Sequence, residues 1–356
     1  MNRKTQVCII GGGPSGLLLS QLLHLKGIDT IVLERQSREY VLARIRAGVL
    51  EQGTVDMLTE IGVGDRLARE RLVHTGLELA FDGRRLRIDL EKLAGKTVSI
   101  YGQSEIQKDL MEAHAAAGTR IVYEAEDVSL HGLVGAGPAV LRYTKGGRGH
   151  EVMCDFIAGC DGFHGICRPS FPPGVLTFYD REYPFGWLGI LSESPPPDHE
   201  LIYAYHERGF ALFSMRAPTL SRLYLQCAPD EDLELWPDEK IWDELRTRLG
   251  GSCALPQGKI LLKGVTPMRS FVVEPMQYGR LFLAGDAAHI QPPTGAKGMN
   301  LAFADVVFLS RALAQYYRTR STEALDRYSE TCLGRVWKAQ RFSWFMTQLL
   351  HRFPQE

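Results

Sequence analysis

A glycine-rich segment near the start of the chain has residue types and spacing that suit a phosphate-containing ligand. Gly11, Gly13 and Gly16 fit the pattern G-x-G-x-x-G, between a strand-like apolar run and a helix-like apolar run. In such a unit the first glycine allows a tight turn, the second lets a pyrophosphate approach the backbone, and the third lets helix and strand pack closely. The amides around Ser15, at the helix N-terminus, attract the anion. The pattern predicts a dinucleotide site, although glycine triplets also occur in ordinary turns.

Three carboxylates closely follow strand-like runs and could complete such a site. Glu34 ends the second run, 18 residues after Gly16, where it would accept hydrogen bonds from the ribose hydroxyls of an adenosine. Asp161 and Asp286 stand just after two further apolar runs. A solvated carboxylate at a strand end is the plain alternative for Glu34, and the glycine motif before it makes that alternative the weaker one.

Together these segments resemble the three fingerprints of the FAD-dependent monooxygenases. The fingerprints are the N-terminal glycine motif, a D-G pair in mid-chain (Asp161-Gly162) and a G-D motif late in the chain (Gly285-Asp286), and they occur here in that order. The resemblance implies that the chain binds FAD. It also implies that Asp286 holds the ribitol hydroxyls and that Asp161 lies between the flavin and a nicotinamide nucleotide.

The elements that must position these residues can be predicted from the apolar pattern. Runs at 6–10 and 30–33, with a helical stretch at 17–25 between them, predict a βαβ unit. The middle of the chain has short β-like runs separated by turns, which predict an antiparallel sheet. These runs are 185–191, 200–205, 209–215 and 222–226. A β-like run at 280–284 and a helical pattern at 301–317 predict a return to an α/β layer.

The predicted fold class is α/β. We expect a Rossmann-like FAD-binding domain of the glutathione-reductase type, a substrate-binding antiparallel sheet and a C-terminal helical region. The expected ranges are 1–175 for the FAD-binding domain and 176–267 for the substrate sheet. Residues 268–356 are expected to return to the FAD-binding domain and to form a helical interface region.

Composition limits the classes of partner. The 356 residues are 45% hydrophobic, which suits a globular protein of about two domains. A net charge of -1, from 41 basic and 42 acidic residues, argues against nucleic acid or an anionic membrane as a partner. The seven cysteines include no C-x-x-C pair, so we expect no metal site and no disulfide framework. No apolar run approaches the ~20 residues of a membrane span, and we expect a cytoplasmic protein.

Longer blocks of sequence are similar to the 4-hydroxybenzoate hydroxylases among the flavin-dependent aromatic hydroxylases. The blocks are 40–52, 183–188, 199–203, 269–276 and 292–300. The resemblance implies a small aromatic carboxylate with a para hydroxyl as substrate. It assigns the carboxylate to Arg216, whose planar guanidinium can bind bidentately, with Ser214 and Tyr224 as hydroxyl donors. The plain alternative is a surface arginine on a sheet.

The same resemblance assigns residues to the substrate hydroxyl, since a phenol with a pKa near ~10 is mostly neutral at pH 7. Tyr203 would hydrogen-bond the phenol and help to ionise it, and the carbonyl of Pro293 would contact the same hydroxyl. His74 resembles the outer histidine of the family's proton relay, a position where a pKa near ~6.5 would suit proton exchange with solvent. The relay's second tyrosine would lie beyond Glu356, so we expect either a further C-terminal segment or another route for the proton.

Further residues resemble cofactor contacts of the family. The loop 292–300 leads into a helix, whose N-terminal amides would face the pyrimidine side of the flavin. Arg35, Gln36 and Tyr40 match the pattern of members that prefer NADPH. The expected contacts are Arg44, Arg46 and Gln103 on FAD, Arg44 also on the nicotinamide nucleotide, Arg222 on the outward flavin, and Gly298 and Asn300 on the flavin ring.

The resemblance implies an enzyme of aromatic catabolism that converts 4-hydroxybenzoate into 3,4-dihydroxybenzoate. It implies NADPH and O2 as co-substrates, a flavin C4a-hydroperoxide as the oxygenating species, and a homodimer. Tyr205 and Gln291 depart from the family's pattern, which leaves open another aromatic acid, such as an amino- or dihydroxybenzoate. A protein of another class, which oxidises NADPH without oxygenating anything or senses an aromatic acid, also stays open.

Overall fold

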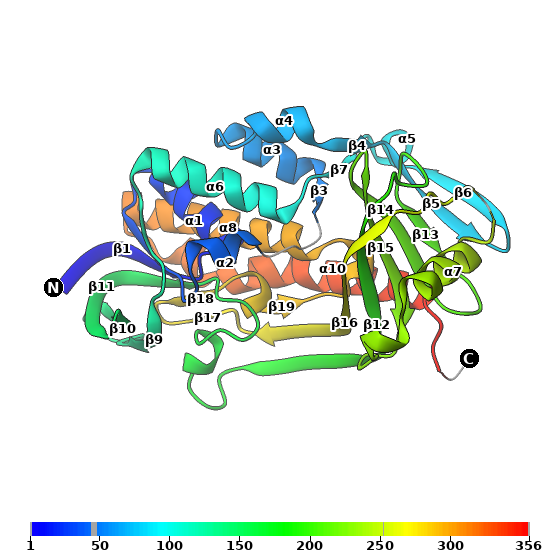
Figure 1. Ribbon diagram of the computed structural model, residues 1–356. Coiled ribbons are helices and arrows are strands. Elements are labelled where there is room, and N and C mark those ends of the chain that lie inside the picture. Colours follow the sequence, from blue (N-terminus) through cyan, green and yellow to red (C-terminus); the bar gives the residue numbers. More distant parts are fainter. Residues whose placement is uncertain (1, 44–47, 252, 355–356) are drawn as a thin grey trace.

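The computed structural model describes residues 2–43, 48–251 and 253–354, which form two large sheets with helices packed against them (Figure 1). The first sheet begins with β1 (Asn2–Ile10), followed by α1 (Pro14–His24) and β2 (Thr30–Leu33). β1 pairs in parallel with β2, so the predicted βαβ unit is confirmed. All four residues of β2 are buried, as expected for a strand of a parallel sheet covered on both faces.

The parallel strands of this sheet have the order β18-β11-β1-β2-β8. β17 pairs antiparallel with β18 at one edge, and β10 and β9 extend antiparallel from β11. The bounds are β8 (Arg120–Val122), β9 (Glu126–His131), β10 (Ala139–Lys145), β11 (Arg148–Gly159), β17 (Gln277–Tyr278) and β18 (Leu281–Leu283). Because parallel strands end at the same edge of a sheet, the segments after β1, β2, β11 and β18 meet there.

Helices α1, α6 (Gln103–Ala117) and α8 (Gly298–Thr319) lie side by side against this sheet, with α1 between the other two (Figure 1). Leu17, Leu18 and Leu19 are all fully buried, as the dense apolar stretch at 17–25 predicts. A small third sheet and several short helices adjoin them. Their bounds are β3 (Val49–Glu51), β4 (Leu72–His74), β7 (Val98–Ile100), α2 (Arg38–Ala43), α3 (Gln52–Glu60), α4 (Asp65–Glu70), α5 (Leu90–Ala94) and α9 (Glu323–Asp326).

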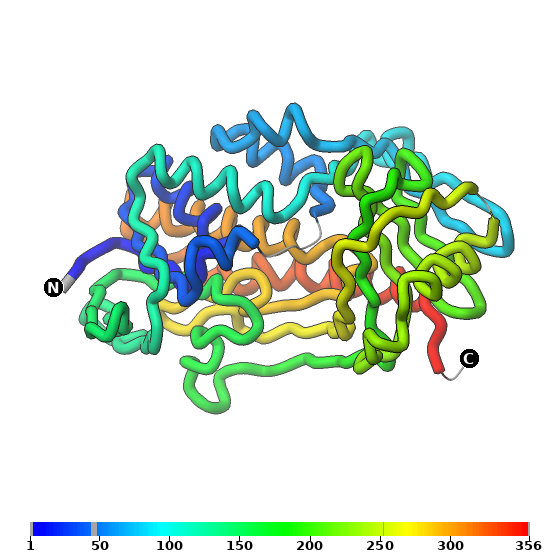
Figure 2. Tube along the Cα trace, in the orientation of Figure 1, coloured from blue at the N-terminus to red at the C-terminus, as the bar shows by residue number. Residues whose placement is uncertain are grey.

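The second large sheet has the order β19-β16-β12-β15-β14-β13-β5-β6 and is antiparallel except between β13 and β5. Its long strands β12 and β16 pair along most of their length and lead from the first sheet to the second (Figure 2). The bounds are β5 (Gly76–Phe81), β6 (Arg84–Asp89), β12 (Thr177–Glu193), β13 (Ile202–Ala204), β14 (Ala211–Ala217), β15 (Leu220–Cys227), β16 (Lys259–Glu274) and β19 (His289–Ile290). The expected α/β class, with a parallel sheet, an antiparallel sheet and C-terminal helices, is confirmed.

Strand membership differs in part from the sequence prediction. The hairpin β5–β6 joins the second sheet through β13, although it lies far before the predicted limit at residue 175. This pairing joins segments more than 100 residues apart, so no local pattern reveals it. β13 is shorter than the predicted run 200–205, and just before it the side chain of Glu200 accepts a hydrogen bond from Gly76 N. The three domain ranges remain our proposal for the main segments of the chain, with β5–β6 added to the second.

Two helices flank the second sheet. α7 (Asp238–Leu249) covers one face, and α10 (Tyr328–Leu350) runs from the parallel sheet toward the second sheet (Figure 1). The two ends of the chain lie at opposite ends of the molecule (Figure 2). Four short 3-10 helices complete the fold, η1 (Arg168–Ser170), η2 (Leu233–Leu235), η3 (Gly285–Ala287) and η4 (Pro293–Gly295). In the part of the chain that the structure describes, no helix has the length and apolar character needed to cross a membrane.

Candidate active site

The order of the parallel strands brings the three predicted fingerprints together. The strands β18, β11, β1 and β2 are neighbours in the sheet. Asp286 follows β18, Asp161 follows β11, the glycine motif follows β1, and Glu34 follows β2. All four segments therefore lie at one edge of the sheet. This is the edge at which open α/β sheets bind nucleotides.

The glycines let the loop pack closely against the sheet and leave open space at Gly13, where a pyrophosphate would bind. A Cβ added at Gly11 would collide with the carbonyl oxygen of Cys160, and one added at Gly16 would collide with that of Gly11. A Cβ at Gly13 would meet nothing within 4 Å. The first turn of α1 contains no acidic residue and no side chain caps it, so no side chain competes for its amides. This donor set fits the phosphates of a dinucleotide.

Glu34 holds the glycine loop and remains at the sheet edge. Its carboxylate accepts hydrogen bonds from Gly12 N at 2.6 Å and from Gln36 N at 2.7 Å. The loop is also held by Gln107 of α6, whose Nε2 donates to Gly12 O at 2.8 Å. Sequence reasoning missed Gln107, because its contact joins residues that are 95 positions apart.

The two aspartates of the fingerprints have different surroundings. Asp161 closes its own loop, since its carboxylate accepts from Cys167 N at 2.9 Å and leaves no room for a Cβ at Gly165. Burial raises the pKa of Asp161. Its role between two cofactors therefore remains a prediction. Asp286 is exposed at the end of β18, where a carboxylate can accept from ligand hydroxyls.

The loop before α8 is fixed by Asn300. The Oδ1 of Asn300 accepts from Glu51 N at 3.0 Å and Thr54 Oγ1 at 2.8 Å, and its Nδ2 donates to the carbonyls of Val49 and Ala296. With both ends of the side-chain amide engaged, the backbone is the part of Asn300 that can contact a flavin. The helix that follows starts at Gly298 and has 22 residues, so its N-terminus faces the loop with a sizeable dipole.

Two predicted cofactor residues, Arg44 and Arg46, lie outside the described residues. Gln103 is the first residue of α6 and follows Gly102. A Cβ added at Gly102 would lie 2.9 Å from the guanidinium Nη1 of Arg216. The start of α6 therefore lies against the arginine that the sequence assigns to the substrate.

The predicted substrate residues share one face of the second sheet. Tyr203 and Tyr224 both pair with Leu212 from opposite sides, and Arg222 pairs with Ser214. Paired residues share a face. Arg216 lies where the register between β14 and β15 shifts, but its charge interacts with Tyr224 and Arg222, which adds it to the set. The residues on this face are Tyr203, Ser214, Arg216, Arg222 and Tyr224. The opposite face packs against α7 in an apolar cluster.

Two cations and two hydroxyl groups make this face suitable for a carboxylate. Arg222 Nε donates to Tyr224 Oη at 3.2 Å, and its guanidinium lies over the ring at 5.1 Å. A Cβ at Gly189 would lie 2.9 Å from Arg222, so this glycine makes room for the side chain. Removal from solvent lowers the pKa of Arg216, and Tyr224 opposes that shift. An anion bound here would offset the cost of holding two guanidinium groups together.

Tyr203 is buried and hydrogen-bonded to the loop before α8. Its hydroxyl donates to the carbonyl oxygen of Thr294 at 3.2 Å. Burial raises the pKa of Tyr203 to about 12, so the side chain is a neutral hydroxyl at pH 7. The neighbouring carbonyl of Pro293 accepts from Ala296 N at 2.9 Å, which leaves its second lone pair for a ligand.

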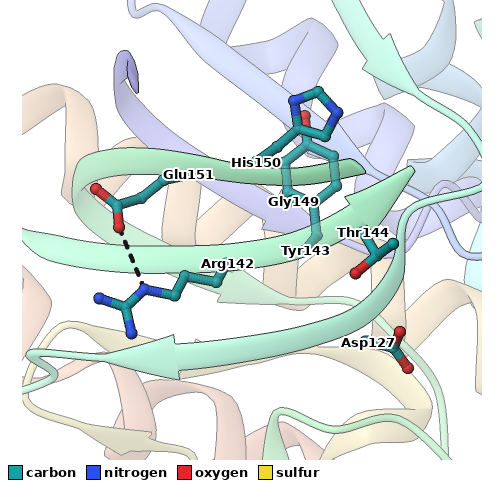
Figure 3. A pocket seen from close by; sticks show the side chains of 7 residues that line it. All are labelled: Asp127, Arg142, Tyr143, Thr144, Gly149, His150 and Glu151. Atoms are coloured by element: carbon teal, nitrogen blue, oxygen red, sulfur yellow. Dashed lines mark hydrogen bonds and ion pairs between the residues drawn. The ribbon is translucent and has the colours of Figure 1, made fainter. Parts of the chain in front are cut away.

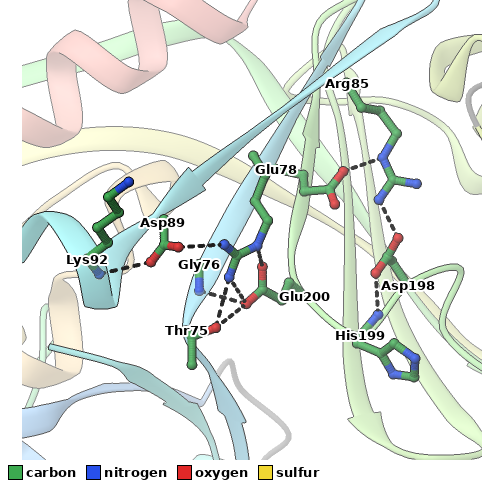
Figure 4. Close-up of polar contacts among 10 residues, drawn as sticks. Thr75, Gly76, Glu78, Arg85, Asp89, Lys92, Asp198, His199 and Glu200 are labelled. Carbon is green, nitrogen blue, oxygen red and sulfur yellow. Dashed lines mark hydrogen bonds and ion pairs between the residues drawn. The ribbon is translucent and has the colours of Figure 1, made fainter.

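His74 is 1% exposed, and neither ring nitrogen has a hydrogen-bond partner among the described residues. Burial lowers the pKa of His74, and the charge of Glu200 opposes that shift. The carboxylate of Glu200 accepts from Gly76 N at 2.6 Å and from Arg87 Nε at 2.8 Å (Figure 4). Glu200 and Arg87, which sequence reasoning missed, thus fix the segment directly after His74.

A second group that the sequence did not reveal links the G-D motif to the loop before α8. His289 Nε2 lies 2.6 Å from Asp305 Oδ2, which also accepts from Gly285 N at 3.0 Å. Gln291 Nε2 lies 2.9 Å from His289 Nδ1. Burial works to lower the pKa of His289, but the carboxylate of Asp305 outweighs it and the pKa is raised. An acidic residue on a buried helix face is the signal that could have indicated Asp305.

Two surface pockets lie away from the candidate site residues. A pocket of about 340 Å³ lies on the strands β9, β10 and β11, where Tyr143 stacks on His150 (Figure 3). None of the candidate site residues lines it. Among the residues with described positions, no three His, Cys, Asp or Glu side chains are grouped as a metal site would require.

Comparison with known proteins places the chain among flavoproteins. The family model described as FAD binding domain matches residues 4–343. A p-hydroxybenzoate hydroxylase of Acinetobacter baylyi is 51% identical to this chain over 99% of it and 88% of its own length. The solved structure of p-nitrophenol 4-monooxygenase PnpA from Pseudomonas putida matches with a TM-score of 0.82 at 19% identity, covering 99% of this chain and 91% of that one. PqsL, a probable FAD-dependent monooxygenase from Pseudomonas aeruginosa, matches with a TM-score of 0.82 at 20% identity, covering 98% and 97%.

Proposed function

The chain belongs to the FAD-binding monooxygenase family, and we propose that it hydroxylates 4-hydroxybenzoate to 3,4-dihydroxybenzoate with NADPH and O2. The observation that carries this proposal is the 51% identity to a p-hydroxybenzoate hydroxylase over nearly the whole chain. The shared sheet face of Tyr203, Arg216 and Tyr224 supports it, because it offers a cationic end and a hydroxyl end to one small aromatic acid.

The residues at the edge of the parallel sheet would hold FAD. The glycine motif and the start of α1 suit its pyrophosphate, Glu34 its adenosine ribose, and Asp286 its ribitol. The start of α8 at Gly298 and Asn300 suits the ring, and Arg44, Arg46 and Gln103 are further proposed contacts. Bound FAD supplies the redox chemistry, since it takes a hydride from NADPH and activates O2.

The substrate carboxylate is bound by the second sheet. Arg216 donates two parallel hydrogen bonds to it, and Ser214 and Tyr224 add hydroxyl donors. Arg222 adds positive charge on the same face. Fixing the carboxylate at one end of a rigid ring also fixes where the opposite, hydroxyl-bearing end lies, so this contact orients the ring carbon to be hydroxylated.

The substrate hydroxyl is bound by Tyr203 and Pro293. Tyr203 is a neutral hydroxyl whose proton goes to Thr294 O at 3.2 Å, and it stabilises a phenolate by turning this proton to the substrate oxygen. The carbonyl of Pro293 accepts from the substrate hydroxyl while that hydroxyl is still protonated. His74 is the proposed next acceptor of the released proton, because its lowered pKa keeps the imidazole neutral. Since the side chain is buried, a local movement must open it to water before the proton leaves. A substrate held as the phenolate has a more electron-rich ring carbon beside the oxygen, which is the carbon to be hydroxylated.

Another aromatic acid is the second candidate substrate. Gln291, two positions before Pro293, has a buried side-chain oxygen with no partner among the residues described by the structure. Such an acceptor suits an amino or a second hydroxyl substituent. An NADPH oxidase or a sensor of aromatic acids would share the cofactor site but would form no new aromatic product.

A homodimer in the cytoplasm completes the proposal. From Trp337 onward, α10 exposes large apolar side chains, which suits an interface between subunits. They are Trp337, Phe342, Trp344, Phe345 and Leu349.

The test is NADPH oxidation by the purified yellow protein, with and without 4-hydroxybenzoate, followed by separation of the aromatic products. One 3,4-dihydroxybenzoate formed per NADPH supports the proposal. Stimulated oxidation that yields only hydrogen peroxide indicates an effector or a different substrate. No stimulation contradicts the proposed substrate and directs the search to other aromatic acids.

A further inference from the structure

A row of buried polar side chains on α10 faces the loop before α8. Gln340, Ser343, Thr347 and His351, the last directly after the helix, are three or four residues apart and therefore lie on one face. All four are buried. Burying a polar group costs free energy unless it finds a hydrogen-bond partner. The hydroxyl of Ser343 has no partner among the described residues, and the partners of the other three show what the helix holds in place.

Thr347 binds Thr294 hydroxyl to hydroxyl, and the direction of that bond follows from its surroundings. Thr347 Oγ1 lies 2.7 Å from the carbonyl oxygen of Ser343 and 3.0 Å from Thr294 Oγ1. A hydroxyl has one proton, and the carbonyl can only accept. Thr347 therefore donates to Ser343 O, and Thr294 donates to Thr347. Since both threonines are at most 1% exposed, water does not compete for this bond.

Thr294 meets Tyr203 through its carbonyl. The carbonyl oxygen accepts from Tyr203 Oη at 3.2 Å, while the hydroxyl of the same residue is tied to α10. A movement of the loop backbone at Thr294 would displace both its carbonyl oxygen and its hydroxyl. The direction in which Tyr203 points its proton, and the lone pairs that it leaves for a ligand, thus depend on how firmly Thr294 is held.

Other members of the row hold the ends of the same region. Gln340 Nε2 donates to Ile290 O at 2.6 Å, just before the loop. A Cβ at Gly295 would collide with the hydroxyl of Ser343, so the loop lies tightly against the helix. His351 Nε2 accepts from Trp187 Nε1 at 2.7 Å on the second sheet. α10 therefore sets the loop and the substrate sheet in a fixed relation.

We propose that Thr347 is a positioning residue for the hydroxylation, which acts through Thr294 to set how the proton of Tyr203 is shared between Thr294 O and the substrate phenol. The inference rests on the proposed function, because it assigns a role relative to a bound 4-hydroxybenzoate. Thr347 contacts neither substrate nor cofactor in this scheme. Its effect appears in the ionisation of the bound substrate and not in the affinity for the carboxylate end.

The test uses Thr347→Val and Thr294→Val, measured as purified, FAD-loaded proteins. The absorbance of bound 4-hydroxybenzoate is recorded against pH to obtain its apparent pKa, and product formed per NADPH is measured beside it. Loosening Thr294 weakens the carbonyl that competes with the substrate for the proton of Tyr203. We therefore expect the ionisation constant of the bound substrate to rise about threefold to tenfold, the scale of one hydrogen bond, with a nearly unchanged dissociation constant. Thr294→Val removes the bond between the two threonines but keeps the bond from Thr347 to Ser343 O. It therefore tests the inference even if Thr347→Val does not fold.

Two further variants separate positioning from packing. Thr347→Ser keeps the hydroxyl and should restore the wild-type ionisation. Thr331→Val, on the exposed side of the same helix, removes only a bond to Arg327 O at 2.9 Å and should change nothing. Wild-type ionisation and coupling in both Thr347→Val and Thr294→Val would overturn the inference, whatever their melting temperatures. If the wild-type protein itself forms no 3,4-dihydroxybenzoate, the proposed function has failed, which is a different result.

Discussion

Replacing Arg216 by alanine tests the substrate site most directly. Arg216 is partly buried on a sheet face that it shares with Arg222, and removal from solvent lowers the pKa of its guanidinium. Truncating one partner of a desolvated, hydrogen-bonded charge pair costs about 2–5 kcal/mol. Because Arg222 remains on the same face, we expect about 3 kcal/mol, which is a roughly 100-fold higher dissociation constant for 4-hydroxybenzoate. Arg216→Lys keeps the charge but loses the planar fork, so it should cost less.

The assay is a titration that follows the flavin absorbance or the heat of binding, repeated with 4-hydroxybenzamide, which lacks the negative charge. 4-Hydroxybenzamide should bind the wild type weakly, and Arg216→Ala should reduce its affinity only slightly further. The two ligands and two proteins thus form a double-mutant cycle. Arg142→Ala is the control, since this arginine is 63% exposed at the periphery of the first sheet. Equal losses for both ligands, or no loss for the carboxylate, would refute the assignment of Arg216.

Three other predictions follow from the geometry. Gly13→Ala should weaken FAD binding but leave the melting temperature of the FAD-free protein unchanged, because a Cβ at Gly13 meets no other atom within 4 Å. Gly16→Ala should weaken FAD binding and also lower the melting temperature, because a Cβ at Gly16 collides with the backbone. Similar melting temperatures for the two FAD-free variants would contradict this. Glu200→Gln removes the charge that raises the pKa of His74, so the acidic limb of the pH profile of hydroxylation should move to lower pH. An acidic limb at the wild-type pH would contradict the proton-transfer role of His74. Burial holds the pKa of His351 at about 3, below that of the unfolded chain, so the unfolded state binds the extra proton. The free energy of unfolding should therefore fall as the pH drops from about 6.5 toward 3, by up to about 1.4 kcal/mol per unit, and His351→Gln should flatten this slope in urea denaturation.

The cofactor half of the site was predictable because its signals are local. A glycine needed for close approach, as at Gly16, and an acid one helix later, as at Glu34, reflect the geometry of a single βαβ unit. The run 30–33 coincides with β2 for the same reason.

The support of the site was not predictable, because it is made by pairs far apart in the chain. Gln107 holds Gly12 across 95 positions, and Thr347 holds Thr294 across 53. Within their own helices, the sequence around Gln107 and Thr347 contains no motif that indicates these contacts. The hairpin β5–β6 shows the same limit at the level of strands, since its partner β13 lies more than 100 residues later.

The sequence by itself determined the class of ligand, the fold class and the candidate residues, since strand and helix periodicity and the glycine motif act over a few residues. The tertiary structure alone decided which groups hold those residues in place and in which direction their hydrogen bonds run. It turned the carboxylate of Asp161 into its own loop, engaged both ends of the Asn300 amide, and directed the proton of Tyr203 to Thr294. A hydrogen bond requires two atoms within about 3 Å of each other, and only the packing of the whole chain establishes that distance.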